Sequence, residues 1–456
     1  MTTRHREVGS VEEGKPPGGA PAESLWGWGR HPVVAARELR GEDLEKIAGR
    51  GVLSRGLGRS YGDASLPPPG ATALGSRLAD RILSFDPESG ELHAEAGLSL
   101  TEINRIFWPR LFSSPILPGT QQITLGGMVA ADVHAKNHHV DGTFGRHVRR
   151  LRLALASGEI VWCSRQEERE LFLATLGGMG LTGHILEVVV GLQRIPSAWI
   201  YAETERINDL GVFLRGLKEA ARDWPFTMGW IDCLKRGKGM GRGILYRGRW
   251  ATAGEAPAKA PKPKKRIRVP IDFPSSLLNK ASIGLFNFGV YHSHVPRLKR
   301  GVQHPEDFFH PLDKIQDWNR CYGKAGFTQY QCVVPEPDDA RAFLELLTRL
   351  GAASFLCVIK DCGEEGDGLL SFPKRGTSIA VDIPVRRDTP EVVRKLNELV
   401  IPAGGRVYLA KDTFTTAADF RAMEPRLGAF LAARRRYDPE GRLKSLLSQR
   451  LFGDAP

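Results

Sequence analysis

The chain carries the sequence Arg55-Gly-Leu-Gly-Arg-Ser-Tyr-Gly-Asp63 directly after a short apolar turn. Its three glycines let the backbone turn sharply and aim consecutive N–H groups at an anion such as a pyrophosphate. Arg59 and Ser60 add further hydrogen-bond donors. The spacing G-x-G-x-x-x-G is one residue longer than the nicotinamide-dinucleotide fingerprint, so a Rossmann domain is disfavoured. On this loop alone, an ordinary tight turn stays an alternative.

Two further segments have the same character. Leu117-Pro-Gly-Thr-Gln-Gln-Ile-Thr-Leu-Gly-Gly127 combines a Pro-Gly turn, two threonine hydroxyls and paired glycines before a stretch of small residues that predicts a helix. Thr175-Leu-Gly-Gly-Met-Gly-Leu-Thr-Gly183 precedes a predicted strand. Because three separated glycine-rich segments fall within one domain-sized stretch, we predict an extended dinucleotide ligand lying across that domain.

A metal site is the alternative for the histidines that follow the second segment. His134 and His138 stand four residues apart, with Asp132 nearby, and would share one face of a helix. Lys136 would then sit among the ligands, and no glutamate stands beside His134 to act as a base. We therefore predict no metal.

The chain length and the pattern of strands predict two domains. A chain of 456 residues exceeds what a single core usually covers. Short β-type runs alternate with glycine-rich turns up to Ile195, and new strands, including Gln329-Tyr-Gln-Cys-Val-Val334, follow the turn at Pro196. We expect an α+β protein divided into a flexible leader (1–25), a glycine-rich domain (26–195), a second domain (196–406) and a C-terminal segment (407–456) with a helical pattern over 417–435.

The amino-acid composition limits which binding partners and which cellular compartment are expected. Lys and Arg total 64 against 52 Asp and Glu, a formal charge of +12 that favours anionic partners. Since no recognition motif or aromatic platform accompanies the basic runs, no nucleic-acid role is expected. The six cysteines form no C-x-x-C pair, which indicates a reducing compartment. With no secretory signal and no span of roughly 18 to 20 apolar residues, we expect a cytoplasmic protein whose membrane contact is peripheral.

A basic loop and an apolar stretch stand next to each other in the second domain. Residues 255–270 alternate Pro, Ala and Lys, which disfavours regular structure and predicts a mobile loop. An apolar stretch runs from Ile271 to Phe288. This pair suits a phosphate with its lipid tail, or an anionic membrane surface. An ordinary loop that leads into the core is the third interpretation.

Taken together, the motifs resemble the decaprenylphosphoryl-β-D-ribose 2′-oxidase family, the flavin subunit of the 2′-epimerase of mycobacterial arabinan synthesis. The family belongs to the vanillyl-alcohol-oxidase superfamily with PCMH-type FAD domains. The resemblance covers the chain from about Trp26 to Leu451. It is carried by Gly56-Leu-Gly-Arg-Ser-Tyr-Gly-Asp63, Leu117-Pro-Gly-Thr-x-Gln122, His134-x-Lys-Asn-His-His139, Gly177-Gly-Met-Gly-Leu-Thr-Gly183 and Gly404-Gly-Arg-Val-Tyr-Leu-Ala-Lys-Asp412.

The resemblance implies a two-domain vanillyl-alcohol-oxidase-type flavoprotein that holds FAD non-covalently. Residues 26–195 are then the PCMH-type FAD domain, 196–406 a substrate domain with an antiparallel sheet, and 407–456 a segment that returns to the FAD domain. The residues implied to contact FAD are Arg55, Gly56, Leu57, Gly58, Arg59, Ser60, Tyr61, Gly119, Thr120, Thr124, Gly126, Gly127, His134, Asn137, Gly180, Thr182, Gly183 and Tyr408.

The resemblance also implies a substrate pocket. Oxidation of an alcohol needs a hydride acceptor close to the carbon and a group that takes the hydroxyl proton. Lys411 is expected to stabilise charge and contact the sugar, Tyr61 or Tyr408 to accept the proton, and Gln331 to bind sugar hydroxyls. Mycobacterial members have Asn and Cys at the positions of Ser378 and Ala380, which changes the expected size and polarity of the pocket. The implied substrate-lining residues are Lys136, Trp230, Gln329, Gln331, Lys360, Ser378, Ala380 and Lys411.

The implied reaction is oxidation of the 2′-hydroxyl of a polyprenyl-phosphoryl-β-D-ribose to the 2′-keto sugar, the first half of epimerisation to an arabinose donor. A separate NAD(P)H-dependent short-chain reductase would complete it, because this chain lacks the nicotinamide fingerprint. The expected location is the inner face of an anionic membrane, with partner-assisted export to the periplasm as the alternative. A soluble sugar or alditol oxidase using oxygen and a non-catalytic flavin-binding accessory protein stay open as other functions.

Overall fold

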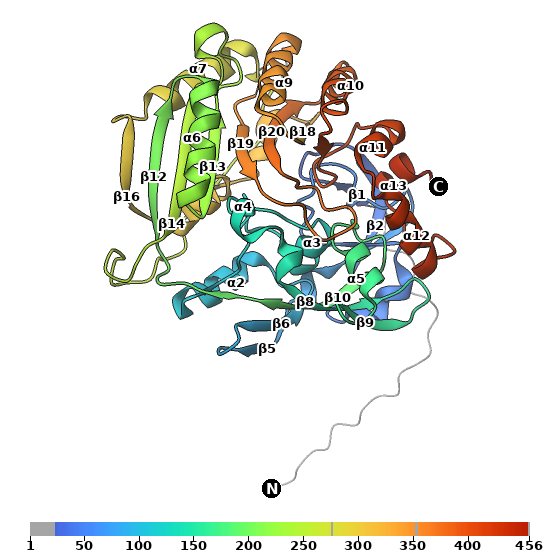
Figure 1. Cartoon of the computed structure of the whole chain (residues 1–456). Helices are drawn as coiled ribbons and strands as arrows, with labels where there is room; N and C mark the ends of the chain where they lie inside the picture. The colour runs from blue at the N-terminus through green and yellow to red at the C-terminus, as the bar shows by residue number, and fades with distance from the viewer. Residues whose placement is uncertain (1–22, 275–276, 352–353, 455–456) are drawn as a thin grey trace.

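The computed structural model describes residues 23–274, 277–351 and 354–454. The predicted leader is shorter than expected at its end, because Glu23–Trp26 forms strand β1 and pairs antiparallel with β2 (Val33–Arg40). Residues 1–22 of that leader lie outside the described residues. The N-terminal domain, from residue 23 to 195, forms the lower part of the molecule in Figure 1, and a second, larger sheet lies above it.

Short strands and helices make up the N-terminal domain. They are β3 (Leu53–Arg55), β4 (Thr72–Gly75), β5 (Ile82–Asp86), β6 (Glu91–Glu95), α2 (Leu100–Phe107), β7 (Phe112–Ser113), α3 (Leu125–Ala130), α4 (His138–Asp141), β8 (Val148–Ala154), β9 (Ile160–Ser164), α5 (Arg169–Thr175), β10 (His184–Gly191) and β11 (Gln193–Arg194), with the one-turn α1 (Leu44–Ile47) near the start. One sheet has the order β1-β2-β4-β3, and the other has the order β5-β6-β10-β8-β9 with antiparallel neighbours throughout. Apolar residues of α2, α3 and α5 pack with the second sheet in one core.

The second domain is built on an eight-stranded sheet. Its elements are β12 (Ile200–Ile207), α6 (Leu210–Asp223), β13 (Phe226–Ile231), β14 (Gly243–Trp250), β15 (Ile267–Arg268), α7 (Lys280–His292), β16 (Leu298–Gln303), α8 (Pro305–Phe309), β17 (Ile315–Gln316), β18 (Phe327–Val334), α9 (Pro337–Leu350), β19 (Cys357–Cys362), β20 (Gly376–Pro384), α10 (Thr389–Val400) and β21 (Arg406–Val407). The order β16-β12-β14-β13-β19-β20-β18-β21 is antiparallel at every pair, which confirms the predicted antiparallel sheet.

Helices α6 and α9 cover one face of this sheet, and part of the other face is left for a ligand. Helix α6 contacts β13 and β14, and α9 contacts β18 and β20 (Figure 1). Because strand side chains alternate between faces, Tyr330 of β18 stacks on Phe343 of α9 while Gln329 and Gln331 point to the opposite side. The α+β, two-domain architecture expected from the family resemblance is therefore present.

The C-terminal segment lies against the N-terminal domain. The helical pattern over 417–435 is divided into α11 (Ala417–Met423) and α12 (Leu427–Tyr437), since Pro425 interrupts the run. Helix α12 contacts α5, and α13 (Leu446–Phe452) begins where the Leu446 N–H donates to the Leu66 carbonyl at 2.9 Å. Figure 1 shows these red helices beside the lower domain.

The basic loop predicted over 255–270 has little regular structure. Only the two-residue strand β15 falls within it, paired in parallel with β17. Within the described parts of the chain, no helix combines the length and apolarity needed to cross a bilayer.

Candidate active site

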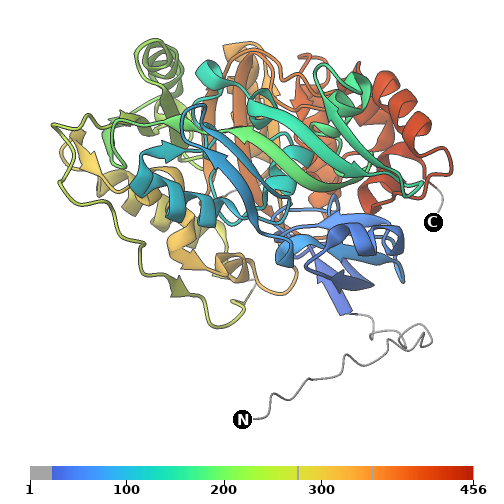
Figure 2. The same ribbon diagram turned by 90° about the horizontal axis from the view of Figure 1, so that it is seen from below.

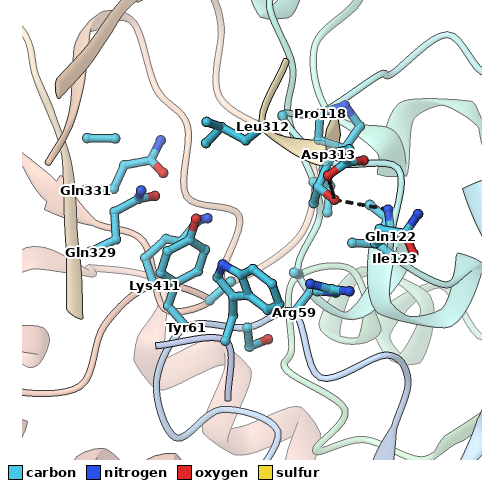
Figure 3. Close-up of a pocket in the computed structure, with 18 of the residues that line it drawn as sticks. Arg59, Tyr61, Pro118, Gln122, Ile123, Leu312, Asp313, Gln329, Gln331 and Lys411 are labelled. Atoms are coloured by element: carbon cyan, nitrogen blue, oxygen red, sulfur yellow. Dashed lines mark hydrogen bonds between the residues drawn. The ribbon is translucent and has the colours of Figure 1, made fainter. Parts of the chain in front are cut away.

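A large cavity of about 1040 Å³ lies between the glycine-rich loops and the free face of the eight-stranded sheet. All three glycine-rich segments contribute to its wall. In Figure 3, Gln329 and Gln331 stand on one side, Tyr61 and Lys411 in the middle, and Arg59 toward Gln122 and Ile123 on the other side. The two domains therefore build one site together.

The glycine side of the cavity accepts a ligand in close contact with the backbone. A Cβ added at Gly119 would meet nothing within 4 Å, and one at Gly180 would meet only a leucine carbon at 3.7 Å. Gly58 has φ +64°, a left-handed conformation that favours glycine. Backbone without side chains along a cavity of this size fits an extended dinucleotide.

Gly56 has a packing reason as well. A Cβ at this position would lie 2.4 Å from Thr124 Oγ1. The same hydroxyl accepts a hydrogen bond from the Gly127 N–H at 3.2 Å, as the N-cap of α3. The first loop thus rests directly on the start of α3, which aligns two of the three cavity-lining segments.

Arg59 supplies a cation to the cavity wall. Its guanidinium lies 4.0 Å from the centre of the Trp28 ring, and burial lowers its pKa. Among the described residues, its buried Nε has no hydrogen-bond partner. A buried donor with a positive charge costs free energy unless an anion binds it, so this arrangement fits a phosphate of FAD.

Replacing this guanidinium should weaken cofactor binding selectively. A charge-assisted hydrogen bond contributes about 1.5–3 kcal/mol, so we expect Arg59→Met to raise the dissociation constant of FAD by roughly 10- to 150-fold. Titration of deflavinated protein followed by flavin fluorescence measures this constant. An unchanged constant in a folded variant would show that Arg59 does not contact the cofactor.

Three residues expected to contact FAD have other roles. Arg55 is absent from the cavity wall, because its guanidinium donates to the Ser65 carbonyl at 3.2 Å and the Trp26 carbonyl at 2.7 Å. It packs beneath the loop, where a Cβ on Gly58 would lie 2.5 Å from its Nη2. The arginine therefore supports the loop from behind.

Asn137 and Thr182 are likewise buried outside the cavity wall. The Asn137 amide donates to the Pro115 carbonyl at 2.8 Å, which fixes the chain before the second glycine-rich segment. The Thr182 hydroxyl bonds that of Thr175 at 2.9 Å and closes the third segment on itself. Neither side chain lines the cavity, and direct contact of either with FAD stays a prediction. The remaining expected FAD residues, Gly56, Leu57, Gly58, Arg59, Ser60, Tyr61, Gly119, Thr120, Thr124, Gly126, Gly127, His134, Gly180, Gly183 and Tyr408, all line the cavity.

The sheet side of the cavity brings together every residue expected to bind substrate. The register pairs Gln331 with Ala380 and Lys360 with Ser378 across neighbouring strands. Period-two alternation then aims all four toward the cavity. The wall contains Lys136, Trp230, Gln329, Gln331, Lys360, Ser378, Ala380 and Lys411.

A hydrogen-bonded network around His134 holds this wall. Lys360 Nζ contacts the Nδ1 of His134, and the Gln331 amide lies 3.3 Å from its Nε2. Gln331 also donates to the Ser378 hydroxyl at 3.2 Å. Burial, with the nearby Lys360 charge, holds the pKa of His134 well below its ordinary value, so the imidazole is neutral.

Three lysines line the cavity: Lys136 is buried, and Lys360 and Lys411 are partly exposed to it. Burial lowers the pKa of Lys136 to about 7, of Lys360 to about 8 and of Lys411 to about 7. The charge of Lys360 lowers the values of the other two further. Each amine is thus poised between its neutral and charged forms near neutral pH, which suits proton transfer.

Asp382 is a functional residue that the sequence reasoning missed. Its carboxyl accepts from Gln329 Nε2 at 2.6 Å and from the Tyr322 hydroxyl at 3.0 Å. Burial raises its pKa to about 7, and its charge raises that of Lys411. Asp382 stands two residues after Ala380 and therefore on the same face of the strand. This two-residue spacing in the sequence could have indicated that Asp382 lies near the site.

The two tyrosines are poor proton acceptors. The Tyr408 hydroxyl donates to the Ala131 carbonyl at 2.9 Å, and burial raises its pKa. Tyr61 has a pKa well above its ordinary value because of burial, and the Lys411 Nζ lies 3.5 Å from the centre of its ring. Lys411, whose lowered pKa leaves part of the population neutral, is therefore a better candidate for the base than either tyrosine.

The far end of the cavity is apolar. Ile283, Phe286 and Val290 of α7 line it, together with Met228 of β13 and Tyr246 of β14. Aliphatic and aromatic side chains without a charged partner favour a hydrocarbon over a second sugar. The sequence showed that α7 is apolar but not that it borders the site.

The histidine segment has no metal-site geometry. His134 lies outside any helix, the His138 Nδ1 accepts from the Gly363 N–H at 3.0 Å, and Asp132 accepts from the Gly145 N–H at 2.8 Å. Across the described residues, no group of three or more histidine, cysteine or acidic side chains is arranged to hold a metal ion.

Comparisons with known proteins agree with this geometry. The FAD binding domain family matches residues 46–164, which contain the first two glycine-rich segments. The decaprenylphosphoryl-β-D-ribose oxidase of Mycolicibacterium smegmatis is 35% identical over 449 residues, 94% of this chain and 97% of that protein. An uncharacterised protein of Streptomyces coelicolor is 29% identical over 78% of this chain and 100% of its own length. The L-gulonolactone oxidase of Scyliorhinus torazame is 27% identical over 30% of this chain and 32% of its own. FAD as the cofactor is thereby confirmed.

Proposed function

The chain belongs to the decaprenylphosphoryl-β-D-ribose oxidase family and is an FAD-dependent oxidoreductase, and from this we propose that its substrate is a polyprenyl-phosphoryl-β-D-ribose. The reaction is oxidation of the 2′-hydroxyl to a 2′-keto sugar. One observation carries the proposal: a single cavity joins the glycine-rich loops, the polar wall of Gln329 and Gln331, and the apolar face of α7. The glycine-rich loops suit a cofactor, the polar wall suits a sugar, and the apolar face of α7 suits a lipid tail.

The chain's own residues supply the proton chemistry. FAD, when bound by the glycine-rich loops and Arg59, supplies the acceptor for the hydride that leaves the alcohol carbon. Lys411, with a pKa of about 7, is neutral in part of the population and accepts the hydroxyl proton as the carbonyl forms. The resulting ammonium is stabilised by Asp382, whose charge favours the protonated lysine.

Amide and lysine side chains orient the sugar. Gln329 is fixed by Asp382 and Gln331 by Ser378, so each amide keeps free valences for ribose hydroxyls. Lys136 donates to the Phe309 carbonyl at 2.8 Å and holds a cation at the opposite wall. Polar groups held by their neighbours in advance reduce the entropy lost on binding.

Product analysis tests both the substrate and the position of oxidation. The protein is incubated with a short-chain polyprenyl-phosphoryl ribose and a dye acceptor, and the product is reduced with sodium borodeuteride. We expect one deuterium at C2′ in a mixture of ribo and arabino sugars. Deuterium at another carbon would contradict the assigned hydroxyl, and equal turnover of free ribose would contradict the lipid-linked substrate.

Non-covalent attachment of FAD is part of the proposal. His134 lines the cavity, but both its ring nitrogens already contact Lys360 and Gln331, which leaves no free nitrogen for a bond to the flavin. Precipitation of the protein with acid should leave all yellow colour in the supernatant. Colour retained in the pellet would indicate a covalent link.

The reaction is half of an epimerisation. A 2′-ketone can be reduced from the opposite face to give the arabinose epimer, and we propose that a separate NAD(P)H-dependent short-chain reductase does so. The product would serve as an arabinose donor for cell-wall arabinan. The first glycine-rich loop, with its G-x-G-x-x-x-G spacing, supports a partner for the nicotinamide step.

We place the protein at the periphery of an anionic membrane, on the cytoplasmic face, with partner-assisted export as the alternative. The lipid-linked substrate and the basic loop support this. The soluble sugar oxidase is not favoured, because the relative that spans 94% of this chain is named for a lipid-linked ribose. Three cavity-lining lysines with lowered pKa values speak against a non-catalytic accessory role.

A further inference from the structure

Helix α7 is apolar around its whole circumference. Between Lys280 and His292 it contains no charged side chain, and the sequence from Leu277 to Pro296 contains no acidic residue. A helix of this kind is normally buried in a core or a membrane. In this protein one side of α7 packs on the second domain, whereas the other side of the helix is not covered by the described residues.

The outward side of α7 is exposed. Leu285 is 74% exposed, Phe286 50% and Phe288 53%. Among the described residues, eight of the fourteen exposed large hydrophobic side chains fall between Ile267 and Ile315. Three of them stand within four residues of α7, which is typical of an interaction site rather than of scattered surface residues.

The inward side fixes the helix to the sheet. Asn287 is fully buried and its amide donates to Asp232 at 2.9 Å. The Tyr291 ring lies 4.7 Å from the Arg242 guanidinium. These contacts determine which side of α7 faces the protein and which side faces outward.

The same helix forms a wall of the cavity. Ile283, Phe286 and Val290 recur at helical spacing and border the apolar end of the site. Phe286 belongs to both surfaces, since it lines the cavity and is half exposed. A hydrocarbon chain can thus pass from outside α7 to the sugar-binding wall without leaving apolar surroundings.

Unpaired basic side chains lie in the neighbouring loop. Lys259, Lys262 and Lys265 are exposed, and within the described part of the chain none of them forms a salt bridge. Figure 2 shows the yellow segments of the second domain on the side of the molecule away from the red C-terminal helices. Closer to the apolar face, Lys280 at the start of α7 and Lys299 of β16 are also exposed, and among the described residues neither forms a salt bridge. Apolar side chains near such cations complement an anionic bilayer interface.

We propose that α7 inserts its outer face into the surface of an anionic bilayer and forms the portal through which the substrate's lipid tail enters the cavity. Leu285, Phe286 and Phe288 enter the acyl region, while Lys280 and Lys299 contact phosphate head groups. The passage of the tail rests on the proposed function. The seating of α7 on the bilayer does not, because it follows from exposure and charge alone.

Vesicle binding tests the seating without any substrate. The FAD-loaded full-length protein is mixed with vesicles of phosphatidylcholine alone or with 30 mol% phosphatidylglycerol, and bound protein is separated by flotation. We expect binding only to the anionic vesicles. The variant Leu285→Glu/Phe288→Glu should partition at least about 100-fold more weakly, because two large side chains leave the acyl region and two charges enter it.

A matched variant controls for the added charge. Leu78→Glu/Leu83→Glu makes the same change at exposed residues of the N-terminal domain and should bind vesicles as the parent does. Equal loss in both variants, equal binding of the parent to neutral vesicles, or unchanged binding of the α7 variant would each overturn the proposal. A parent dimer that the α7 substitutions convert to a monomer, without vesicle binding, would assign the surface to self-association instead.

Turnover separates the portal from the proposed function. Leu285 and Phe288 do not line the cavity, so the α7 variant should oxidise a water-soluble short-chain substrate at the parent rate. It should oxidise long-chain substrate embedded in anionic vesicles at least tenfold more slowly. Equal rates on the embedded substrate would overturn the portal, whereas a parent protein inactive on both substrates would refute the proposed function and leave the vesicle result standing.

Discussion

Replacing Lys411 by methionine should slow turnover strongly while leaving FAD bound. A general base contributes about 10²- to 10⁴-fold to a proton transfer, and methionine fills much of the same volume without an amine. We therefore expect the rate of flavin reduction by substrate to fall by about that factor in Lys411→Met. Stopped-flow absorbance under anaerobic conditions measures this rate directly.

The pH dependence provides a second readout of the same role. The neutral amine is the reactive form, so kcat/KM of the parent should rise as the pH increases through about 7, the lowered pKa of Lys411. In the methionine variant this limb should be missing. The control is Lys395→Met, which changes an exposed lysine. This variant should keep the parental rate of flavin reduction and the rise of kcat/KM near pH 7. A Lys411→Met protein with parental rates would assign the base to another group.

Replacing Arg450 by methionine should destabilise the protein strongly. Its guanidinium bonds both oxygens of Asp63 at 2.7 and 2.9 Å and contacts Asp412 at 2.8 Å. Both carboxyl groups are buried, and removing their partner leaves two unpaired acids. Loss of one member of a buried ion pair costs about 3–5 kcal/mol, and we expect a fall of that size in the free energy of unfolding.

The position of this ion pair predicts a functional loss as well. Asp63 ends the first glycine-rich loop and Asp412 follows Lys411, so Arg450 ties the cofactor loop to the base. We expect Arg450→Met to bind FAD more weakly. Arg436→Met, which breaks an exposed pair with Glu170, should change stability by at most about 1 kcal/mol. Urea unfolding followed by fluorescence compares the two, and equal small effects would contradict the proposed tie.

The sequence predicted the parts of the site that local chemistry determines. A glycine cluster is visible in the local sequence and by itself indicates that the backbone comes close to a ligand. The three predicted segments do line one cavity in the structure. Gln329 and Gln331 could be assigned to one face because strand alternation is a local rule. The positions of Lys360 and Lys411 came from the family resemblance, since a single lysine carries no such pattern.

Other features depend on contacts between distant parts of the chain. Arg55 stands inside the motif but turns away, because Ser65 and the Trp26 carbonyl bind it from behind. The role of Asp382 in the site could not be predicted, because its hydrogen bonds with Gln329 and Tyr322 join parts of the chain that are distant in sequence. Helix α7 was predicted as an apolar stretch. That one of its sides borders the cavity and another faces outward could not be predicted, because this depends on how the helix packs on the sheet. Tertiary hydrogen bonds of this kind leave no trace in local spacing.

The central claim is that this flavoprotein oxidises a lipid-linked ribose in the cavity between its two domains. Anaerobic addition of polyprenyl-phosphoryl ribose to the purified yellow protein, followed by the visible flavin band, tests it most directly. We predict complete bleaching by this compound and none by free ribose at the same concentration. A band that stays oxidised with the lipid-linked sugar but bleaches with a free sugar would contradict the claim.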